Sequence, residues 1–138
     1  MSVSTDLIWA ISQDNSSYLV KARTAGGVQF SKDPLNLTGK NSSTHGGVFT
    51  PKAIGIRKLA DGSIELSTKV TKNANKPAKN VAKTVFKPTK SARSVAAAVS
   101  KAAAGYRDDL RYAAVIKASA LARSNKPKQV RAEKPARK

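Results

Sequence analysis

The chain has 138 residues and no cysteine, and its 26 lysine and arginine residues outnumber its 8 acidic residues, which gives a formal net charge of +18. This length suits one domain with appended segments, and the lack of cysteine excludes disulfides, cysteine-ligated zinc and a thiol nucleophile. The longest uninterrupted apolar runs have five residues, such as 7–11. A membrane-spanning helix needs about 20, so we expect no membrane segment.

The first predicted element is a short helix over 6–13, which Ser4 or Thr5 can cap. Asp6 lies in its first turn, where a negative charge suits the helix dipole. A strand is predicted over 18–22, and the glycine pair at 26–27 indicates a turn.

The clearest β signal lies in 52–70, where Asp61-Gly62 marks a hairpin turn. A two-residue loop would place the isoleucines of the first strand and Ile64 on opposite faces. A three-residue loop over 60–62, with Gly62 in the left-handed conformation, avoids this conflict. It places on one face Ile54, Ile56, Ile64, Leu66 and Val70.

Lysines recur through the next segment at 69, 72, 76, 79, 83, 87 and 90, which is helical spacing. Pro77 and Pro88 interrupt that pattern, because proline breaks a helix interior. The favoured prediction is therefore an extended basic arm over 72–91, and a basic helix is the alternative.

Two alanine-rich helices are predicted next. Ser91 can cap the first, over 92–104, and Gly105 ends it. The second runs over 107–123 and has Asp108 and Asp109 in its first turn. Successive residues of a helix turn by about 100°. On that count, the apolar arc of the second helix consists of Leu110, Ala113, Ala114, Ile116, Ala120 and Leu121, and Lys117 falls within it.

The predicted fold class is α+β: a small antiparallel sheet with a short N-terminal helix, then a basic arm, two alanine-rich helices and a basic tail. The predicted division is a globular part over 1–71, the arm over 72–91, a helical segment over 92–124 and a disordered tail over 125–138. Residues 1–70 have a net charge of +3 and residues 71–138 of +15. The second half is therefore expected to fold poorly alone, because like charges repel and alanine buries little area.

The sequence argues against an enzyme. His45 is the single histidine, and one histidine without cysteine makes no typical zinc site. Asp108 and Asp109 point about 100° apart on a helix, so they do not suit paired acid–base work, and no glycine-rich phosphate loop is present. We expect no catalytic residues, metal, cofactor or small-molecule substrate.

The positive charge needs a polyanionic partner, and nucleic acid is the leading candidate. A membrane surface ranks low, because it calls for a basic helix with large apolar residues and Trp9 lies in the near-neutral half. Composition leaves two alternatives open: an RNA-binding protein, and a linker-histone-like protein that binds DNA in chromatin.

A family resemblance favours RNA. The stretch "YRDDLRYAAVIKASALARSNKP" resembles the C-terminal helix of the eukaryotic large-subunit ribosomal protein twenty-eight family. "FSKDPLNLTGKNS" at 30–42, "IGIRKLADG" at 54–62 and Lys76-Pro77-Ala78 resemble further motifs of the family, in the same order. Together these matches extend over roughly residues 4–127.

The resemblance implies a structural component of the large ribosomal subunit, located on cytoplasmic ribosomes after a nucleolar assembly stage. Its expected partners are ribosomal RNA and neighbouring ribosomal proteins. RNA, more than the protein core, would hold the last helix, and recognition would be largely of shape and backbone. The residues predicted to bind RNA are Lys21, Arg23, Lys40, Asn41, Ser42, Lys52, Lys76, Lys79, Lys83, Lys87, Arg93, Arg107, Arg111, Lys117, Arg123, Lys126 and Lys128.

Overall fold

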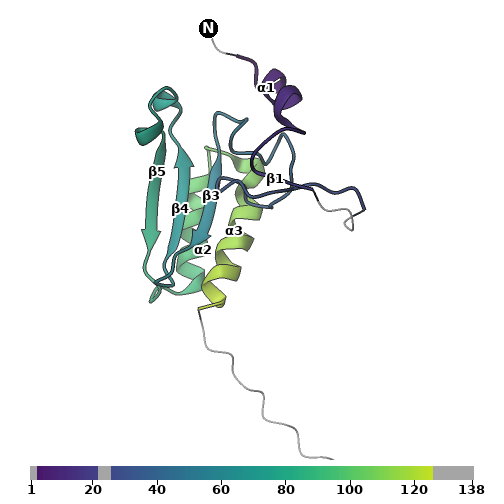
Figure 1. Cartoon of the computed structure of the whole chain (residues 1–138). Helices are drawn as coiled ribbons and strands as arrows, with labels where there is room; N and C mark the ends of the chain where they lie inside the picture. Colours follow the sequence, from purple (N-terminus) through teal and green to yellow (C-terminus); the bar gives the residue numbers. More distant parts are fainter. Residues whose placement is uncertain (1–2, 22–25, 126–138) are drawn as a thin grey trace, which may run out of the picture.

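The structure, a computed structural model, describes residues 3–21 and 26–125. Strands β3, β4 and β5 form an antiparallel sheet, α2 and α3 cover one face of it, and α1 stands at one end of the molecule (Figure 1). The predicted α+β class is confirmed. The elements are α1 (Thr5–Ser12), β1 (Leu19–Val20), β2 (Phe30–Ser31), β3 (Ile54–Lys58), β4 (Ile64–Lys69), the 3-10 turns η1 (Thr71–Asn73) and η2 (Pro77–Lys79), β5 (Val81–Phe86), α2 (Ala92–Ala103) and α3 (Asp108–Arg123).

The β3–β4 hairpin has the predicted three-residue loop. The Leu59 amide donates to the Ser63 carbonyl at 2.8 Å, and Ile56 pairs with Leu66. Gly62 has a φ of 76°, a left-handed conformation that costs other residues roughly 1–2 kcal/mol. This register turns the isoleucines and Leu66 toward the helices, where they are buried.

The segment over 72–91, expected as an extended arm, joins the sheet in the structure. Residues 81–86 form β5, which pairs along β4 from Lys69↔Val81 to Ile64↔Phe86. Phe86 points into the core, whereas Val81, Lys83 and Val85 lie on the opposite face. Four residues of this strand favour β structure, namely Val81, Thr84, Val85 and Phe86. The lysine spacing and the two prolines around it nevertheless led to the prediction of an unpaired arm.

The boundaries of the C-terminal helices agree with the sequence prediction. The Ser91 hydroxyl accepts from the Ser94 amide at 3.3 Å and caps α2. Gly105, with a φ of 72°, separates the two helices. Asp108 and Asp109 occupy the first turn of α3, where their charge opposes the positive end of the helix dipole.

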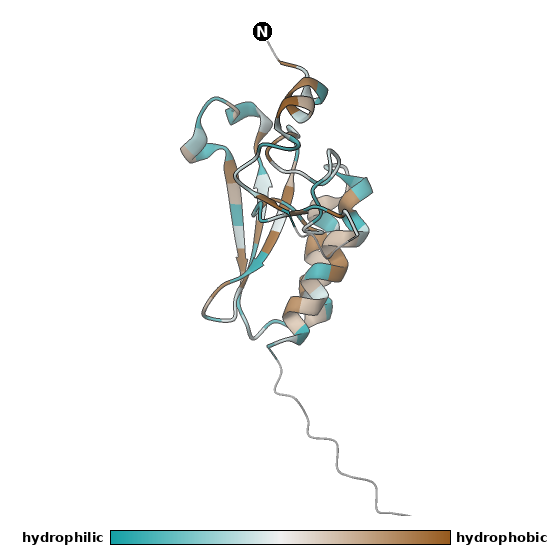
Figure 2. Cartoon of the chain, turned by 45° about the vertical axis from the view of Figure 1, so that its right-hand side comes forward, coloured by the Kyte–Doolittle hydropathy of each residue, from teal (hydrophilic) through white to brown (hydrophobic). Residues whose placement is uncertain are grey.

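The sheet and the helix pair form two layers (Figure 2). The core lies between these layers, and the alanines of α3 are central to it. Leu110, Ala114, Ala118 and Ala122 recur every four residues and are buried, as are Val95, Val99 and Ala103 on α2. Such ridges at i±4 let two helices interdigitate, and small side chains let their backbones approach closely. The apolar face of α3 is therefore large enough for protein packing, which corrects the expectation that RNA mainly holds this helix.

The buried face of α3 also differs from the predicted arc. Ile116 and Ala120 are exposed, whereas Ala118 and Ala122 are buried. The two faces overlap in part, because Leu110 and Ala114 are buried as predicted and Ala113 and Leu121 pack partly buried against the core.

A long loop over 32–52 covers the outer face of β3. The buried Asp33 carboxylate accepts from the amides of Gly47 at 2.7 Å, Leu35 at 2.9 Å and Val48 at 3.2 Å. A side chain at Gly55 would place its Cβ 2.4 Å from the Pro34 carbonyl oxygen, so glycine permits this close approach. The loop in turn carries Phe49, against which α1 packs.

Candidate nucleic-acid interface

The structure separates the predicted RNA-binding residues into three groups. Three residues lie outside the described ranges: Arg23, Lys126 and Lys128. Ten are exposed on the surface: Lys21, Lys40, Lys52, Lys76, Lys79, Lys83, Lys87, Arg93, Arg111 and Arg123. The remaining four have their polar groups engaged within the protein: Asn41, Ser42, Arg107 and Lys117. Among the exposed residues, Arg111 also donates through Nε to the Ser100 hydroxyl at 2.8 Å.

Arg107 connects the start of α3 to the loops beside it. Its side chain is only 15% exposed, forms an ion pair with Asp109 at 2.6 Å, and donates to the carbonyls of Lys52 at 2.8 Å and Thr44 at 3.0 Å. The hydrogen bond with Asp109 raises the pKa of Arg107, and the same bond lowers the pKa of Asp109. This guanidinium is therefore occupied by protein acceptors, contrary to the phosphate contact suggested for it.

Lys117 has a similar internal role on α3. Its ammonium donates to the carbonyl of the buried Asn36 at 3.0 Å and so ties the helix to the loop. Burial lowers the pKa of Lys117, because the charged form loses hydration. A half-buried amine that donates to the protein is poorly placed to contact a phosphate.

Asn41 and Ser42 stabilise the loop and its link to α1. The side-chain amide of Asn41 donates to the backbone carbonyl of Gln13 at 2.9 Å and to the side-chain carbonyl of Gln29 at 3.1 Å. The Ser42 hydroxyl lies 2.9 Å from Nδ1 of His45. The Asn41 contacts join segments far apart in the chain, which local sequence patterns do not reveal, whereas the Ser42 contact lies within one turn.

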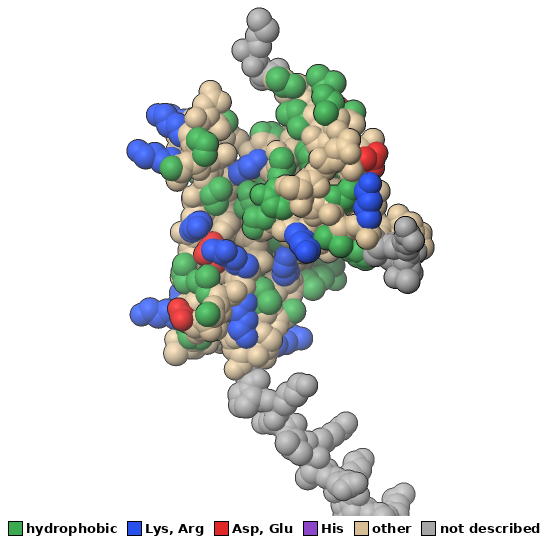
Figure 3. Space-filling view, in the orientation of Figure 1, with side chains coloured by type: hydrophobic (Ala, Val, Ile, Leu, Met, Phe, Trp, Pro, Cys, Tyr) green, Lys and Arg blue, Asp and Glu red, His purple; other side chains and the backbone are tan. Residues whose placement is uncertain are grey.

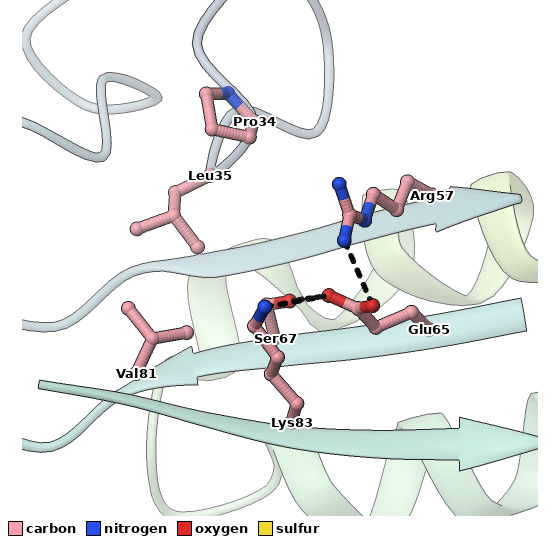
Figure 4. A pocket seen from close by; sticks show the side chains of 7 residues that line it. All are labelled: Pro34, Leu35, Arg57, Glu65, Ser67, Val81 and Lys83. Atoms are coloured by element: carbon pink, nitrogen blue, oxygen red, sulfur yellow. Dashed lines mark hydrogen bonds and ion pairs between the residues drawn. The ribbon is translucent and has the colours of Figure 1, made fainter. Parts of the chain in front are cut away.

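The outer face of the sheet carries a charged cluster that the sequence prediction only partly included (Figure 4). The Glu65 carboxylate, 6% exposed, lies 3.0 Å from Arg57 and 3.9 Å from Lys83, and Ser67 donates to it at 3.0 Å. The hydrogen bond from Arg57 is the main reason that the pKa of Glu65 is lowered. Both cationic side chains remain more than half exposed, so one carboxylate is shared by two accessible cations.

Arg57 is absent from the predicted site. Strand alternation could have revealed it, because Arg57 follows Ile56 and must face away from the core.

Few of the surface cations are neutralised within the protein. Over residues 3–21 and 26–125, the ion pairs involve only Arg57, Lys83 and Arg107 as cations. Lys and Arg side chains are spread over the sheet and over the connection between β4 and β5 (Figure 3). Unpaired charges of one sign build a positive potential that attracts polyanions.

The structure shows no metal centre in the part of the chain that it describes. No group of three or more potential metal ligands comes together there, and no described helix has the length and apolar character to cross a membrane. Fold and surface thus define a small, strongly cationic α+β protein.

Comparison with known proteins places this chain in a family. A family model described as the Ribosomal L28e protein family matches residues 7–124. The chain is 41% identical over 133 residues to the large ribosomal subunit protein eL28 of Schizosaccharomyces pombe, covering 94% of this chain and 98% of the relative. The proteins of the same name from Dictyostelium discoideum and Trypanosoma cruzi are 32% and 36% identical over 82% and 80% of this chain, and over 82% and 70% of their own lengths. The chain belongs to the Ribosomal L28e protein family, which confirms the resemblance and the expectation of a non-enzymatic protein.

Proposed function

We propose that this protein is a structural constituent of the large ribosomal subunit and binds ribosomal RNA through its exposed cations. The observation that carries the proposal is the match to the S. pombe relative, a large-subunit protein, over nearly the full length of both chains. The unpaired surface charge supports RNA as the direct partner, because phosphates supply the missing countercharge. Neighbouring ribosomal proteins complete its surroundings, on cytoplasmic ribosomes after a nucleolar assembly stage.

The proposed RNA-binding surface comprises the exposed cations of the predicted set that lie in or next to η2 and β5, or on α2 and α3. It excludes Arg107 and Lys117, whose donors serve the fold, and adds Arg57. Its members are Arg57, Lys76, Lys79, Lys83, Lys87, Arg93, Arg111 and Arg123. Side chains of this kind contact phosphates and follow the shape of an A-form helix instead of reading bases.

A sucrose-gradient experiment tests the proposal. The tagged full-length chain, expressed in eukaryotic cells, should sediment with large subunits and with 80S ribosomes, and the nucleic acid recovered with it should be ribosomal RNA. Recovery of the protein with chromatin and DNA would contradict the proposal and favour a linker-histone-like role.

A further inference from the structure

The N-terminal helix α1 has an exposed apolar face. Ile8 and Trp9 turn toward the protein, where the Trp9 and Phe49 rings meet edge to face with centroids 5.0 Å apart. On the opposite side, Leu7 and Ile11 lie one turn apart and are 53% and 67% exposed, and Val3 precedes them at 62%. The helix is therefore apolar on both sides, although only one side has a partner within the described protein.

The segment that carries α1 has a charge opposite to that of the rest of the chain. Residues 1–20 contain Asp6 and Asp14 but no lysine or arginine. In the view of Figure 3, hydrophobic side chains gather over α1. An RNA backbone would meet neither a cation nor a donor-rich surface on α1, and it would be repelled by the two carboxylates.

Asp14 strengthens this point because the fold does not explain it. It follows the C-terminal end of α1, where the helix dipole favours a cation and disfavours an anion. Asp14 is exposed and forms no ion pair with a described residue. Its charge has no counterpart among the described residues and would suit a cationic partner.

We infer that the outer face of α1 (Val3, Leu7, Ile11, Asp6 and Asp14) is a docking surface for a neighbouring ribosomal protein, which presents bulky apolar side chains flanked by lysine or arginine. Proteins that bind ribosomal RNA carry excess positive charge, so a neighbour of this kind complements the acidic, apolar surface. This inference rests on the proposed place of the protein in the large subunit. It assigns to α1 a partner class different from that of the cationic faces.

A groove beside α1 extends the same surface. It has a volume of about 370 Å³ and runs between α1 and η1. Its apolar lining consists of Val3, Ile8, Val48, Phe49, Pro51 and Ala74, and its polar lining of Thr5, Thr50, Lys69, Thr71 and Asn80. Val48 is itself about half exposed. A partner side chain seated against Leu7 and Ile11 can thus continue toward an apolar recess, as expected for an interface with a hydrophobic centre and a polar rim.

Site-specific photo-crosslinking tests the partner class directly. A benzophenone amino acid is placed at position 7 of the tagged full-length chain, and in a matched control at position 83 on the proposed RNA-binding surface. Large subunits are then isolated and irradiated. Position 7 should crosslink to an apolar, Lys/Arg-containing segment of a ribosomal protein, and position 83 to ribosomal RNA.

The two positions distinguish the two proposals. Crosslinks from position 7 to RNA, or none from position 7 while position 83 reacts, overturn the docking surface and leave the proposed function intact. A protein crosslink from position 7 without an RNA crosslink from position 83 supports the docking surface and counts against the RNA-binding surface.

Variants of α1 provide an independent measurement. When the double variant Leu7→Ser/Ile11→Ser is co-expressed with wild type, its incorporation into large subunits should be lower by about tenfold or more. The reason is that two apolar contacts with the partner are lost. The control Ile116→Ser removes an exposed apolar residue from α3 and should compete normally. Thermal unfolding of each isolated variant should match wild type, since these side chains are about half exposed or more. Normal incorporation of the double variant would overturn the inference.

Reversing the charge at position 14 should change incorporation into large subunits in opposite directions for a basic protein partner and for an RNA partner. Asp14→Lys suits the helix dipole and raises the net charge by two. It should weaken incorporation if the partner on α1 is a basic protein, and strengthen it if that partner is RNA. Stronger incorporation would overturn the inference.

Discussion

Arg107 and Arg123 flank α3 and have opposite surroundings. The first is enclosed and donates to Asp109 and to two backbone carbonyls. The second is exposed in the last turn, where a cation suits the dipole. Residue type alone made both of them candidate phosphate ligands. Only their environments distinguish an arginine that organises the fold from one that is free to bind RNA.

Replacing these arginines should therefore have different effects. Arg107→Ala should lower the free energy of unfolding by about 1.5–3 kcal/mol, the usual range for lost hydrogen bonds to a charged group. Arg123→Ala should change it by less than about 0.5 kcal/mol, yet weaken RNA binding and reduce the salt slope by about one. Urea unfolding and RNA titrations measure the two effects. A stable Arg107→Ala protein with impaired RNA binding would reverse the assignment.

Lys117 predicts a pH dependence. Its folded pKa lies below the ordinary value of 10.5, because burial penalises the charged amine. The unfolded chain therefore binds more protons between the two pKa values, and stability increases with pH in that window. The unfolding free energy of wild type relative to Lys117→Met should rise as pH increases toward 10.5 and level off above it. A constant difference between the two proteins would show that burial does not perturb this lysine.

The helix pair α2–α3 shows how alanine can build a core. Val95 and Val99 of α2 lie against a ridge of small residues on α3, and the i±4 spacing on both helices allows close approach. Helices of this length are marginal in water by themselves. Their contacts with each other and with the sheet supply the stability that their intrinsic propensity lacks.

Enlarging a buried alanine should disrupt this contact. Ala118, which has no exposed surface, leaves no room for a larger side chain, so Ala118→Leu should cost about 1–3 kcal/mol of unfolding free energy. Ala120→Leu is the matched control, because it makes the same change on the exposed side of the same helix and should cost less than about 0.5 kcal/mol. Chemical denaturation of both variants measures the difference. Equal losses of unfolding free energy in the two variants would show that Ala118 does not lie on the buried face of α3.

At the scale of the whole molecule, charge and hydrophobicity are distributed unevenly. The last 68 residues carry a net charge of +15 and include one strand of the sheet and both helices that cover it. The first 20 residues carry a net negative charge, and they include the apolar helix α1 at one end of the molecule. The fold thus presents two chemically different surfaces, suited to RNA and to protein.

The cationic surface should make RNA binding strongly dependent on salt. If it neutralises about 6–10 phosphates, affinity for structured ribosomal RNA should fall about 10³- to 10⁵-fold between 50 and 200 mM salt. Filter binding or fluorescence anisotropy with the full-length chain measures this slope. The Arg107→Ala variant should retain the same salt dependence as long as the variant stays folded. A flat response would contradict an electrostatic interface.

Local signals in the sequence determined the hairpin loop at Gly62, the cap at Ser91, the break at Gly105 and the acidic start of α3, because each depends on the conformational preferences of a few neighbouring residues. The ordered motifs also determined the family. Tertiary structure decided that residues 81–86 complete the sheet, that alanines form the buried face of α3, and that Arg107, Lys117 and Asn41 serve the fold. These outcomes depend on contacts between segments far apart in the chain, which set the neighbours of each side chain and hence whether its charge or donor remains free.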